Sequence, residues 1–389
     1  MRILQIHNYY QTFGGECHVV DSEKNLLEKA GHTVHQFSKH SRDINTYPMH
    51  KKIKSYLDIP FNQSTSIELA QCIQKFKPDV AHVHNVFPLI SMSAYSTLKA
   101  NNIPTVQTIH NFRFLCPNGL FFTNDHVCEE CQEYSWYKSV QNKCIRNNYL
   151  TSFLYANAIS RAWKQNIIPD AINQYIVLNN FGKRKLIQGG IPENRISICG
   201  NYTDSFADNI MQKDNYILYL GRLSIEKGLF TLLEAMKTLP EVQLKIAGTG
   251  PLDDELSVKI KANKLNNVEL IGFVSGNQKK ELLSKACCLV VPSEWYENFP
   301  ISVIESLALG TPVIASKTGG LPDMIKNEVT GILFEPGNSG SLAKSIRKFL
   351  GDPVKVKKMS QQSLDAAAIQ FGPDKHYMQL MNIYNKVIA

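Results

Sequence analysis

The chain has 389 residues, of which 43% are hydrophobic, so it is long enough for about two domains with packed cores. This composition excludes a disordered chain, and no stretch reaches the roughly 18 apolar residues of a membrane-spanning helix. The net charge is +8, and residues 1–213 carry 22 basic and 16 acidic side chains, which makes that half +6. Such an excess suits an anionic substrate or an anionic membrane surface. Nucleic acid is not expected, because no Lys/Arg-rich run with interleaved aromatic residues occurs.

The N-terminal residues 1–7 lack the long apolar segment and the cleavage site of a signal peptide. They are typical of a first β-strand. We therefore expect a cytoplasmic protein, which could act at the inner face of the cytoplasmic membrane.

Short apolar runs alternate with segments of helical periodicity along the first half of the chain. Strands are expected at 2–7, 33–38, 79–84, 104–110 and 174–178, and a helix is expected at 19–30. Short strands separated by helices predict a parallel sheet with helices on both faces.

The same pattern restarts after the polar segment 200–214, which we interpret as an interdomain linker. Strands are expected at 215–220, 242–247, 268–271, 288–291, 312–315 and 331–334, and helices at 228–239 and 374–388. The sequence therefore predicts an α/β protein with two Rossmann-like, doubly wound domains that face a central cleft. The predicted parts are 1–204 with a Cys-rich insertion at 112–148, 214–370, and a C-terminal helix at 371–389. Sheets of this kind bind ligands at the carboxyl ends of their strands.

The densest group of candidate functional residues, 293–305, follows a predicted strand. Pro300 suits the first position of a helix, so Glu305 would lie about one and a half turns into that helix, with Glu297 in the loop before it. A helix N-terminus binds phosphate through its free N–H groups, and flanking carboxylates suit sugar hydroxyls. The alternative is a capped helix whose glutamates only offset the helix dipole.

A second group, Gly221–Gly228, follows the first strand of the second predicted domain and contains Arg222 and Lys227. Arg can bind a phosphate through two parallel hydrogen bonds, and Lys can act as a point charge. Together they could neutralise a diphosphate leaving group in place of a metal ion, so no catalytic metal is expected. The alternative is a solvated turn in which Lys227 pairs with Glu226.

Two further features follow strands of the first predicted domain. Gly14 and Gly15 would let the backbone approach a ligand closely, or they form an ordinary turn. The G-x-G-x-x-G fingerprint is absent, which argues against a nicotinamide or flavin cofactor. His110 could donate to a substrate hydroxyl or transfer a proton. His82 and His84 are expected to pack or bond within the fold.

Four of the nine cysteines are bunched with the spacing C-x11-C-x2-C-x12-C: Cys116, Cys128, Cys131 and Cys144. The C-x2-C pair has the short spacing that a tetrahedral metal site needs. We expect a structural zinc here, with an iron–sulfur cluster as the second choice and four free thiols as the alternative. A catalytic zinc is not expected, because four thiolates would close its coordination sphere.

The residues Gly221–Lys227, the pair Glu297-x7-Glu305 and the segment Thr318–Pro322 resemble the retaining nucleotide-sugar glycosyltransferases of the GT-B fold, in the large family 4 of group 1 type. The resemblance covers nearly the whole chain. It implies that 1–204 is the acceptor-side domain, that 214–370 binds the nucleotide sugar, and that the final helix crosses back to the first domain.

The resemblance also implies roles for individual residues. Glu297 and His110, the expected catalytic residues, would contact the donor sugar, while Glu305 would bind the ribose hydroxyls. The diphosphate would be held by Arg222 and Lys227 and approached by Gly14 and Gly15. The other implied donor-binding residues are Phe273, Val274, Asn298, Phe299 and Ile301. The chain departs from many members of the family at Asn111, where Asp is common, and at Pro300, where Gly is common.

The expected function is transfer of a sugar from a UDP or GDP sugar, with retention of anomeric configuration, to a glycan or lipid-linked glycan acceptor. The expected setting is biosynthesis of a surface polysaccharide: a capsule, O-antigen or exopolysaccharide. The alternatives are a nucleotide-sugar epimerase of the same architecture and a non-catalytic nucleotide-sugar-binding protein. Two segments that combine basic and aromatic residues, 47–57 and 149–163, could contact an anionic membrane, although ordinary packing would also explain them.

Overall fold

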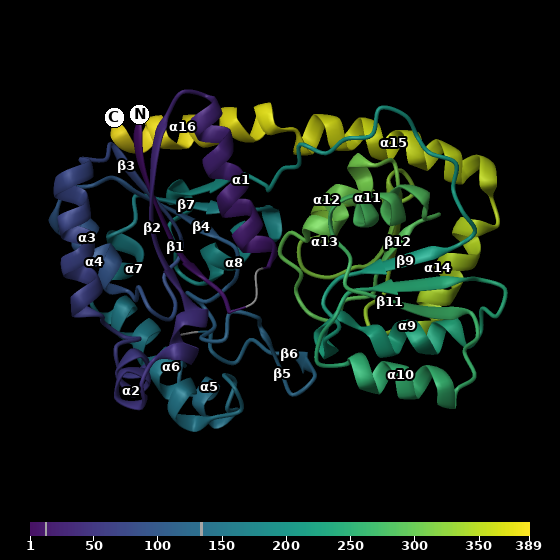
Figure 1. Cartoon of the computed structure of the whole chain (residues 1–389), viewed down its shortest axis with the longest axis horizontal. Coiled ribbons are helices and arrows are strands. Elements are labelled where there is room, and N and C mark those ends of the chain that lie inside the picture. The colour runs from purple at the N-terminus through teal and green to yellow at the C-terminus, as the bar shows by residue number, and fades with distance from the viewer. Residues whose placement is uncertain (12–13, 133–134) are drawn as a thin grey trace. The chain divides into compact units, whose positions relative to one another are not determined.

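The computed structural model describes residues 1–11, 14–132 and 135–389, which divide into two compact units (Figure 1). Unit 1 consists of residues 1–124, 128–200 and 376–389, and unit 2 of residues 125–127 and 201–375. Phe13, which precedes the predicted glycine pair, lies outside the described residues. None of the helices in the described part of the chain is both long and apolar enough to cross a membrane.

Unit 1 is built on a six-stranded sheet in the order β2-β1-β3-β4-β7-β8, in which neighbouring strands run parallel. The strands are β1 (Arg2–Tyr9), β2 (Thr33–His40), β3 (Val80–Asn85), β4 (Thr105–Ile109), β7 (Gln174–Val177) and β8 (Ile196–Ile198). Every residue of β3, β4 and β7 is buried. This is typical of central parallel strands with helices on both faces.

The helices of unit 1 are α1 (Gly15–Lys29), α2 (Met49–Leu57), α3 (Gln63–Phe76), α4 (Ser93–Ala100), α5 (Lys138–Gln141), α6 (Tyr149–Lys164), α7 (Ile167–Asp170) and α8 (Asn180–Gln188). Its short elements are η1 (Ser41–Thr46), η2 (Glu193–Arg195) and β5 (Phe122–Thr123). The short strand β6 (His126–Val127) lies in the segment 125–127, which belongs to unit 2. An asparagine directly before the first residue caps three of these helices. The side chains of Asn62, Asn148 and Asn179 each accept a hydrogen bond from a backbone N–H of the first turn of α3, α6 and α8.

The C-terminal helix α16 (Pro373–Ile388) completes the core of unit 1. Leu380, Ile383 and Tyr384 on this helix pack in one buried cluster with Ile3 of β1 and Leu27 of α1. Figure 1 shows the end of the chain, in yellow, running beside the strands and helices that are coloured for the start of the chain.

Unit 2 contains a second six-stranded sheet in the order β11-β10-β9-β12-β13-β14, again with parallel neighbours. The strands are β9 (Ile217–Leu220), β10 (Leu244–Ala247), β11 (Val268–Gly272), β12 (Leu289–Val291), β13 (Val313–Ser316) and β14 (Gly331–Phe334). The helices are η3 (Ile225–Lys227), α9 (Leu229–Met236), α10 (Asp253–Ala262), α11 (Gly276–Lys285), α12 (Ile301–Ala308), α13 (Leu321–Met324), α14 (Ser339–Leu350) and α15 (Pro353–Phe371). The strand order reverses direction between β9 and β12, which is the ligand-binding position of doubly wound sheets.

Two predicted boundaries are wrong in a way that bears on the site. The first helix begins at Gly15 rather than at Val19, so the glycine pair forms the helix N-terminus and not a separate turn. Pro300 is not the first helical residue. Its ψ of 123° is extended, and its carbonyl accepts a hydrogen bond from the N–H of Val303, as a residue that caps a helix does.

Candidate functional site

The candidate site of unit 2 lies where the strand order reverses. Lys227 follows β9, and Glu297 follows β12, the neighbour of β9 in the sheet. Lys227 Nζ lies 2.7 Å from Glu297 Oε1. The alternative pairing of Lys227 with Glu226 is wrong, because the Glu226 carboxylate instead accepts a hydrogen bond from Ser224 Oγ. Two residues 70 positions apart are therefore joined at the position that binds ligands in such sheets.

Glu297 is held in its ionised form although it is only 4% exposed. Burial by itself would raise the pKa of this carboxyl, but the ammonium of Lys227 and hydrogen bonds to Lys227 and Ser293 outweigh burial and lower it. Ser293 Oγ donates to Glu297 Oε1 over 2.6 Å. The Lys227 ammonium also lies 4.8 Å from the centre of the Trp295 ring. The site thus offers a fixed negative charge with an adjacent cation.

The loops that carry these residues touch backbone to backbone. A Cβ atom on Gly228 would lie 1.9 Å from the carbonyl oxygen of Pro292, in the loop after β12. A Cβ on Gly319, in the loop after β13, would lie 2.3 Å from the carbonyl oxygen of Glu297, and Gly319 has a positive φ of 57°. Only glycine allows both approaches. The glycines of the predicted motifs therefore allow the loops that carry Glu297 and Lys227 to pack closely together.

Arg222 lies in the same group of loops and is exposed. Its own backbone is fixed, because its carbonyl oxygen accepts a hydrogen bond from Tyr219 Oη over 2.7 Å. Gly248 approaches the same loop so closely that a Cβ would lie 1.8 Å from the carbonyl oxygen of Gly221. Within the described part of the chain, the Arg222 guanidinium makes no hydrogen bond or ion pair, so it can bind an anion without losing another partner.

Glu305 lies on α12 and pairs with a residue that the sequence analysis did not identify. Its Oε1 lies 2.5 Å from Nζ of Lys279 on α11. A lysine in a polar helix carries no sequence signal of its own, so only the packing of α11 beside α12 reveals this pair. A ligand that takes the predicted place beside Glu305 would therefore meet a cation as well as a carboxylate.

The remaining predicted residues of unit 2 surround the start of α12 and the end of β11. Asn298 is buried, and Ile301 begins α12. The Phe299 ring packs edge to face on Phe371 of α15, with ring centres 5.9 Å apart. After β11, Val274 is buried, whereas Phe273 is 73% exposed, which leaves its ring available for stacking.

In unit 1, Gly14 and Gly15 lie at the N-terminus of α1, directly after β1 in the chain. Gly14 has an extended backbone with φ −126° and ψ −176°, and no side chain of the described residues caps the helix. A Cβ on Gly14 would meet no atom of the described residues within 4 Å. Packing against that part of the chain therefore does not require glycine at this position. The N-terminus of a helix is a suitable place for an anion.

His110 follows β4 and is held by a second histidine. Its Nε2 lies 3.0 Å from Nδ1 of His84, the fifth residue of β3. Burial, with further contributions from His84 and His7, holds the pKa of His110 well below its usual range, so its ring is neutral. Asn111 donates to Glu16 Oε2 over 3.5 Å, which links the loop after β4 to α1.

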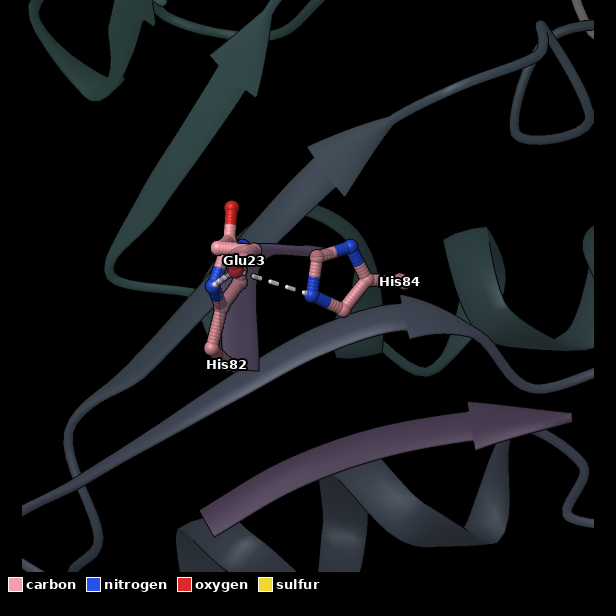
Figure 2. A group of neighbouring side chains, drawn as sticks. All are labelled: Glu23, His82 and His84. Atoms are coloured by element: carbon pink, nitrogen blue, oxygen red, sulfur yellow. Dashed lines mark ion pairs between the residues drawn. The ribbon is translucent and has the colours of Figure 1, made fainter. Parts of the chain in front are cut away.

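Glu23 of α1 contacts buried histidines of unit 1. The sequence analysis did not identify this residue. Figure 2 shows its carboxylate between the rings of His82 and His84, which approach it to 2.9 and 3.3 Å. Among the described residues, these three form the only group of at least three His, Cys, Asp or Glu side chains whose ligand atoms all lie within 4.8 Å of one another. The expectation that His82 and His84 bond within the fold is confirmed.

The four clustered cysteines, Cys116, Cys128, Cys131 and Cys144, all belong to unit 1. Burial and then the neighbouring thiols raise the pKa of Cys131 to about 12, and burial raises the pKa of Cys116 to about 11. The four thiols are thus near enough to interact electrostatically. Among the described residues, however, no three of the sulfur atoms lie within 4.8 Å of one another, so the thiols do not form a closed tetrahedral set.

The chain belongs to the group 1 glycosyltransferases of family 4. Residues 13–205 match the family model described as Glycosyltransferase Family 4, and residues 202–365 match the one described as Glycosyl transferases group 1. Together these matches span both units and contain every predicted site residue. The predicted family and the two-domain GT-B architecture are confirmed.

The relatives include an uncharacterised glycosyltransferase of Methanocaldococcus jannaschii, which is 31% identical over 258 residues. This match covers 64% of the chain and 61% of that relative. A glycogen synthase of Mycobacterium tuberculosis is 32% identical over 74% of the chain and 64% of its own length. The matched region thus spans somewhat less than two thirds of each of these two relatives.

Solved structures share the fold along the whole chain. Sucrose-phosphate synthase from Thermosynechococcus elongatus has a TM-score of 0.73 at 19% identity, with 99% of this chain and 98% of that chain covered. The Anabaena protein HepE in complex with UDP-glucose has a TM-score of 0.69 at 18% identity, with 99% and 100% covered.

Proposed function

We propose that the protein is a retaining glycosyltransferase that moves a sugar from a UDP or GDP sugar to a glycan or lipid-linked glycan acceptor in surface polysaccharide biosynthesis. The observation that carries this proposal is the pair of Lys227 and Glu297 at the strand-order reversal of unit 2. Arg222 follows β9 as Lys227 does, and its guanidinium has no hydrogen bond or ion pair among the described residues. A carboxylate for sugar hydroxyls and two cations for a diphosphate are the groups that a nucleotide sugar requires. The UDP-glucose complex of HepE supports the donor class by analogy.

The reaction requires stabilisation of the charge that develops on the leaving diphosphate. The acceptor hydroxyl attacks the anomeric carbon on the face that the nucleotide leaves, the bond to the diphosphate oxygen breaks, and that oxygen takes the hydroxyl proton. Arg222 and Lys227 neutralise the diphosphate as its charge grows, and Glu297 holds the sugar hydroxyls. As the diphosphate draws Lys227 away from Glu297, the carboxylate becomes available to the sugar.

Nucleotide binding tests the donor class directly. Calorimetric titration with UDP, GDP and ADP in the presence of a chelator should show that UDP or GDP binds without metal. Lys227→Ala and Arg222→Ala should each weaken binding about 10- to 100-fold, which corresponds to about 1.4–3 kcal/mol. Lys344→Ala, at an exposed position of α14, is the matched control. If none of the three nucleotides binds, or if the site variants bind as well as the control, the donor proposal is wrong.

Turnover tests the catalytic role of Glu297. Hydrolysis of UDP-glucose, UDP-N-acetylglucosamine or GDP-mannose serves as the assay, because it needs no identified acceptor. Glu297→Gln should lower kcat at least 100-fold without weakening nucleotide binding, since Lys227 loses the partner that competes for it. Activity within about tenfold of the wild type would refute this role. Release of an isomeric nucleotide sugar with no transfer would favour the epimerase, and nucleotide binding without turnover would favour the non-catalytic protein.

We also propose that the four clustered cysteines bind a structural zinc ion. Four thiols with a C-x2-C pair are a suitable donor set, and the positive charge of a zinc ion would favour the thiolate forms, which burial and the neighbouring sulfur atoms disfavour. Closing the site requires the sulfur atoms to move toward one another.

Metal analysis of the purified protein should give about one zinc per chain. Cys128→Ser should abolish it, whereas Cys72→Ser, on α3, should not. Zinc below a tenth of an equivalent would exclude this site, and an iron signal would replace it by an iron–sulfur cluster.

Peripheral membrane contact through α2 is the third part of the proposal. Met49, Ile53 and Leu57 recur every four residues along this helix and are 72%, 53% and 58% exposed. The neighbouring lysines Lys51 and Lys54 are exposed as well, so the helix combines an apolar stripe with positive charge. Such a helix lies in the interface of an anionic bilayer. The lipid-linked acceptor would be reached at that surface.

Co-sedimentation with vesicles tests this contact. The wild type should bind vesicles that contain phosphatidylglycerol and bind neutral phosphatidylcholine vesicles much less, and high salt should release it. Ile53→Asp should abolish binding. Val258→Asp is the matched control, because Val258 is 65% exposed on α10 of unit 2. Equal behaviour of the two variants would exclude α2 as the membrane contact.

A further inference from the structure

A cavity of about 660 Å³ lies in unit 1 among α5, α6 and α7. This volume is within the range of pockets that bind small ligands. Apart from Gly190, the described residues that line the cavity all come from the segment 136–169, and all of them belong to unit 1. Helix α6 packs against α5, α7 and α2, and Figure 1 shows α5 and α6 side by side. The cavity is therefore a feature of unit 1 alone, and none of the candidate donor-binding residues lines it.

The interior of this cavity is apolar and its opening is aromatic. Trp136 and Trp163 line it and are only 6% and 9% exposed. The ring of Trp163 is held in place, because its Nε1 donates a hydrogen bond to the carbonyl oxygen of Phe114 over 2.9 Å. Tyr137 and Phe153 also line the cavity but are 58% and 53% exposed, so they lie at its opening. Such a lining favours a hydrocarbon ligand over a strongly hydrated one.

The face of α6 that lines the cavity ends in a cation. Phe153, Asn157, Ser160 and Lys164 follow one another at intervals of three or four residues, so they share one face of the helix, and all four line the cavity. Lys164 is exposed in the last turn, and Arg161 lies three residues before it. Neither basic side chain makes a hydrogen bond or an ion pair with another described residue. Both are therefore available to an anionic group at the edge of the cavity.

The whole segment around the cavity is basic. Residues 135–169 include five Lys or Arg side chains and no Asp or Glu, although the chain as a whole has 34 acidic residues. A bias of this kind attracts an anion. In addition, α6 packs against α2, so the cavity lies one helix away from the proposed membrane contact. One apolar cavity with a lysine at its edge fits an amphiphile that has one hydrocarbon chain and a phosphate at the end of that chain.

We propose that this cavity binds the hydrocarbon chain of a phosphorylated long-chain alcohol, and that Lys164 binds the phosphate at the head of the chain. The inference rests on the proposed function, because a lipid of this class carries the glycan in a lipid-linked acceptor. Burial of the chain supplies affinity, and the ammonium of Lys164 selects the charged head group. A bilayer phospholipid is the other source of an apolar chain with a phosphate, but it would bring two chains to a single cavity.

Binding of farnesyl phosphate below its critical micelle concentration tests the site. Trp136 and Trp163 are two of the three tryptophans of the chain, so intrinsic fluorescence reports on the cavity. Farnesyl phosphate should change the emission saturably, farnesol should bind about tenfold more weakly, and inorganic phosphate alone should not bind. Dihexanoyl phosphatidylglycerol, a soluble phospholipid with two chains, should not displace farnesyl phosphate. Absence of saturable binding, equal binding of farnesol, or displacement by the phospholipid would overturn the proposal.

Two variants locate the ligand. Ser160→Phe places a ring in the cavity and should abolish binding of farnesyl phosphate. Lys164→Glu, at an exposed position where the fold tolerates the change, should weaken binding of farnesyl phosphate at least about tenfold and leave that of farnesol unchanged. Lys344→Glu, at an exposed position of α14, is the matched control. The Kd of the nucleotide should stay within about twofold in all three variants, which shows that they are folded. If Ser160→Phe and Lys164→Glu bind farnesyl phosphate as well as the control, the proposal is wrong.

This assay separates the site from the proposals on which it builds. It requires neither a nucleotide sugar nor turnover, so binding of farnesyl phosphate without binding of any nucleotide would refute the function in the previous section and leave the lipid site in place. Hydrolysis of a nucleotide sugar without binding of farnesyl phosphate would refute the lipid site alone. Ile53→Asp should bind farnesyl phosphate like the wild type, because Ile53 lies on α2 and does not line the cavity. Loss of binding in Ile53→Asp would place the lipid on α2 and overturn the proposal.

Discussion

At the scale of single residues, the carboxylates of Glu297 and Glu16 lie in opposite electrostatic environments. Glu297 has an adjacent ammonium, which lowers its pKa against the effect of burial. Glu16, on α1, lies near Arg113 and accepts hydrogen bonds from Tyr10 and Asn111. Burial nevertheless dominates and raises the pKa of Glu16 to about 7. A neutral hydroxyl and an amide stabilise a carboxylate less than a paired cation does. The ionised Glu297 suits substrate binding, whereas Glu16 titrates near neutral pH.

The raised pKa of Glu16 predicts a specific pH dependence of stability. Because the folded state binds this proton more tightly than the unfolded state, its contribution to the free energy of unfolding is full below pH 4.5. This contribution is lost as the pH rises to about 7. The loss is about 3 kcal/mol if the whole pKa shift of Glu16 contributes to the free energy of unfolding. Glu16→Gln should therefore be more stable than the wild type at pH 8, relative to the difference between them at pH 4.

Urea denaturation of both proteins between pH 4 and 8 measures this difference, and other titrating groups cancel in the comparison. Gln keeps an oxygen that accepts from Tyr10, so the fold should be preserved. A difference that does not change between pH 4 and 8 would show that Glu16 has an ordinary pKa.

At the scale of elements, the site of unit 2 is a set of interlocked loops after parallel strands. Glycines at 228, 248 and 319 let the backbones of these loops approach closely enough that any Cβ would overlap a carbonyl oxygen of the next loop. The helices and strands set where the loops begin, and the glycines set how closely they pack. The loops after β9, β10, β12 and β13 therefore behave as one element.

Gly319→Ala tests this interlocking. The added Cβ would lie 2.3 Å from the carbonyl oxygen and 2.6 Å from the nitrogen of Glu297, and the residue would keep a positive φ. We expect a loss of about 1–3 kcal/mol in the free energy of unfolding, together with weaker nucleotide binding. Gly340→Ala, in α14, is the control, because its Cβ would only make ordinary contact at 3.5 Å. Equal stability of the two variants in urea denaturation would contradict the interlocking.

At the scale of the whole molecule, the two ends of the chain share one core. The last helix supplies Leu380, Ile383 and Tyr384 to the cluster that contains Ile3 of the first strand, although more than 370 residues separate Ile3 from each of them. His376 adds a charged contact to Glu23 in the same place. Unit 1 is thus complete only when the last residues of the chain have been added.

The shared core predicts unequal effects of two alanine substitutions on the same helix. Leu380→Ala should cost about 2–5 kcal/mol of stability, because Leu380 is fully buried in the core of unit 1. Met378→Ala should cost less than about 0.5 kcal/mol, because Met378 is 58% exposed. Thermal unfolding followed by circular dichroism compares the two variants. A small effect of Leu380→Ala would mean that α16 does not complete this core.

Sequence patterns predicted the strands and the loops that carry the site, because buried parallel strands are apolar throughout and end where polar loop residues begin. The strand before Lys227 and the strand before Glu297 were both recognisable in this way. The partners of these residues were harder to predict from the sequence. Sequence reasoning expected Lys227 to bind the diphosphate and gave Glu226, its neighbour in the chain, only as the alternative partner, whereas the structure pairs Lys227 with Glu297. It assigned no partner to Glu305 and did not identify Glu23 or Lys279.

These omissions have a common cause, since such residues lie in helices and become significant only through what packs against them. Glu23 has the spacing of an ordinary amphipathic helix, and nothing in its surroundings along the chain distinguishes it from an exposed glutamate. Its structural role depends on contacts with histidines that lie 59, 61 and 353 positions away in the sequence.

By itself, the sequence determined the fold class, the family, and the loops after β1, β4, β9 and β12 that hold the candidate residues, because periodicity and short motifs act along the chain. The tertiary structure decided which charges meet: Lys227 with Glu297, Lys279 with Glu305, and Glu23 with His84 and His376. Pairing depends on distances of a few ångströms between segments far apart in sequence, and strand order and helix packing set those distances.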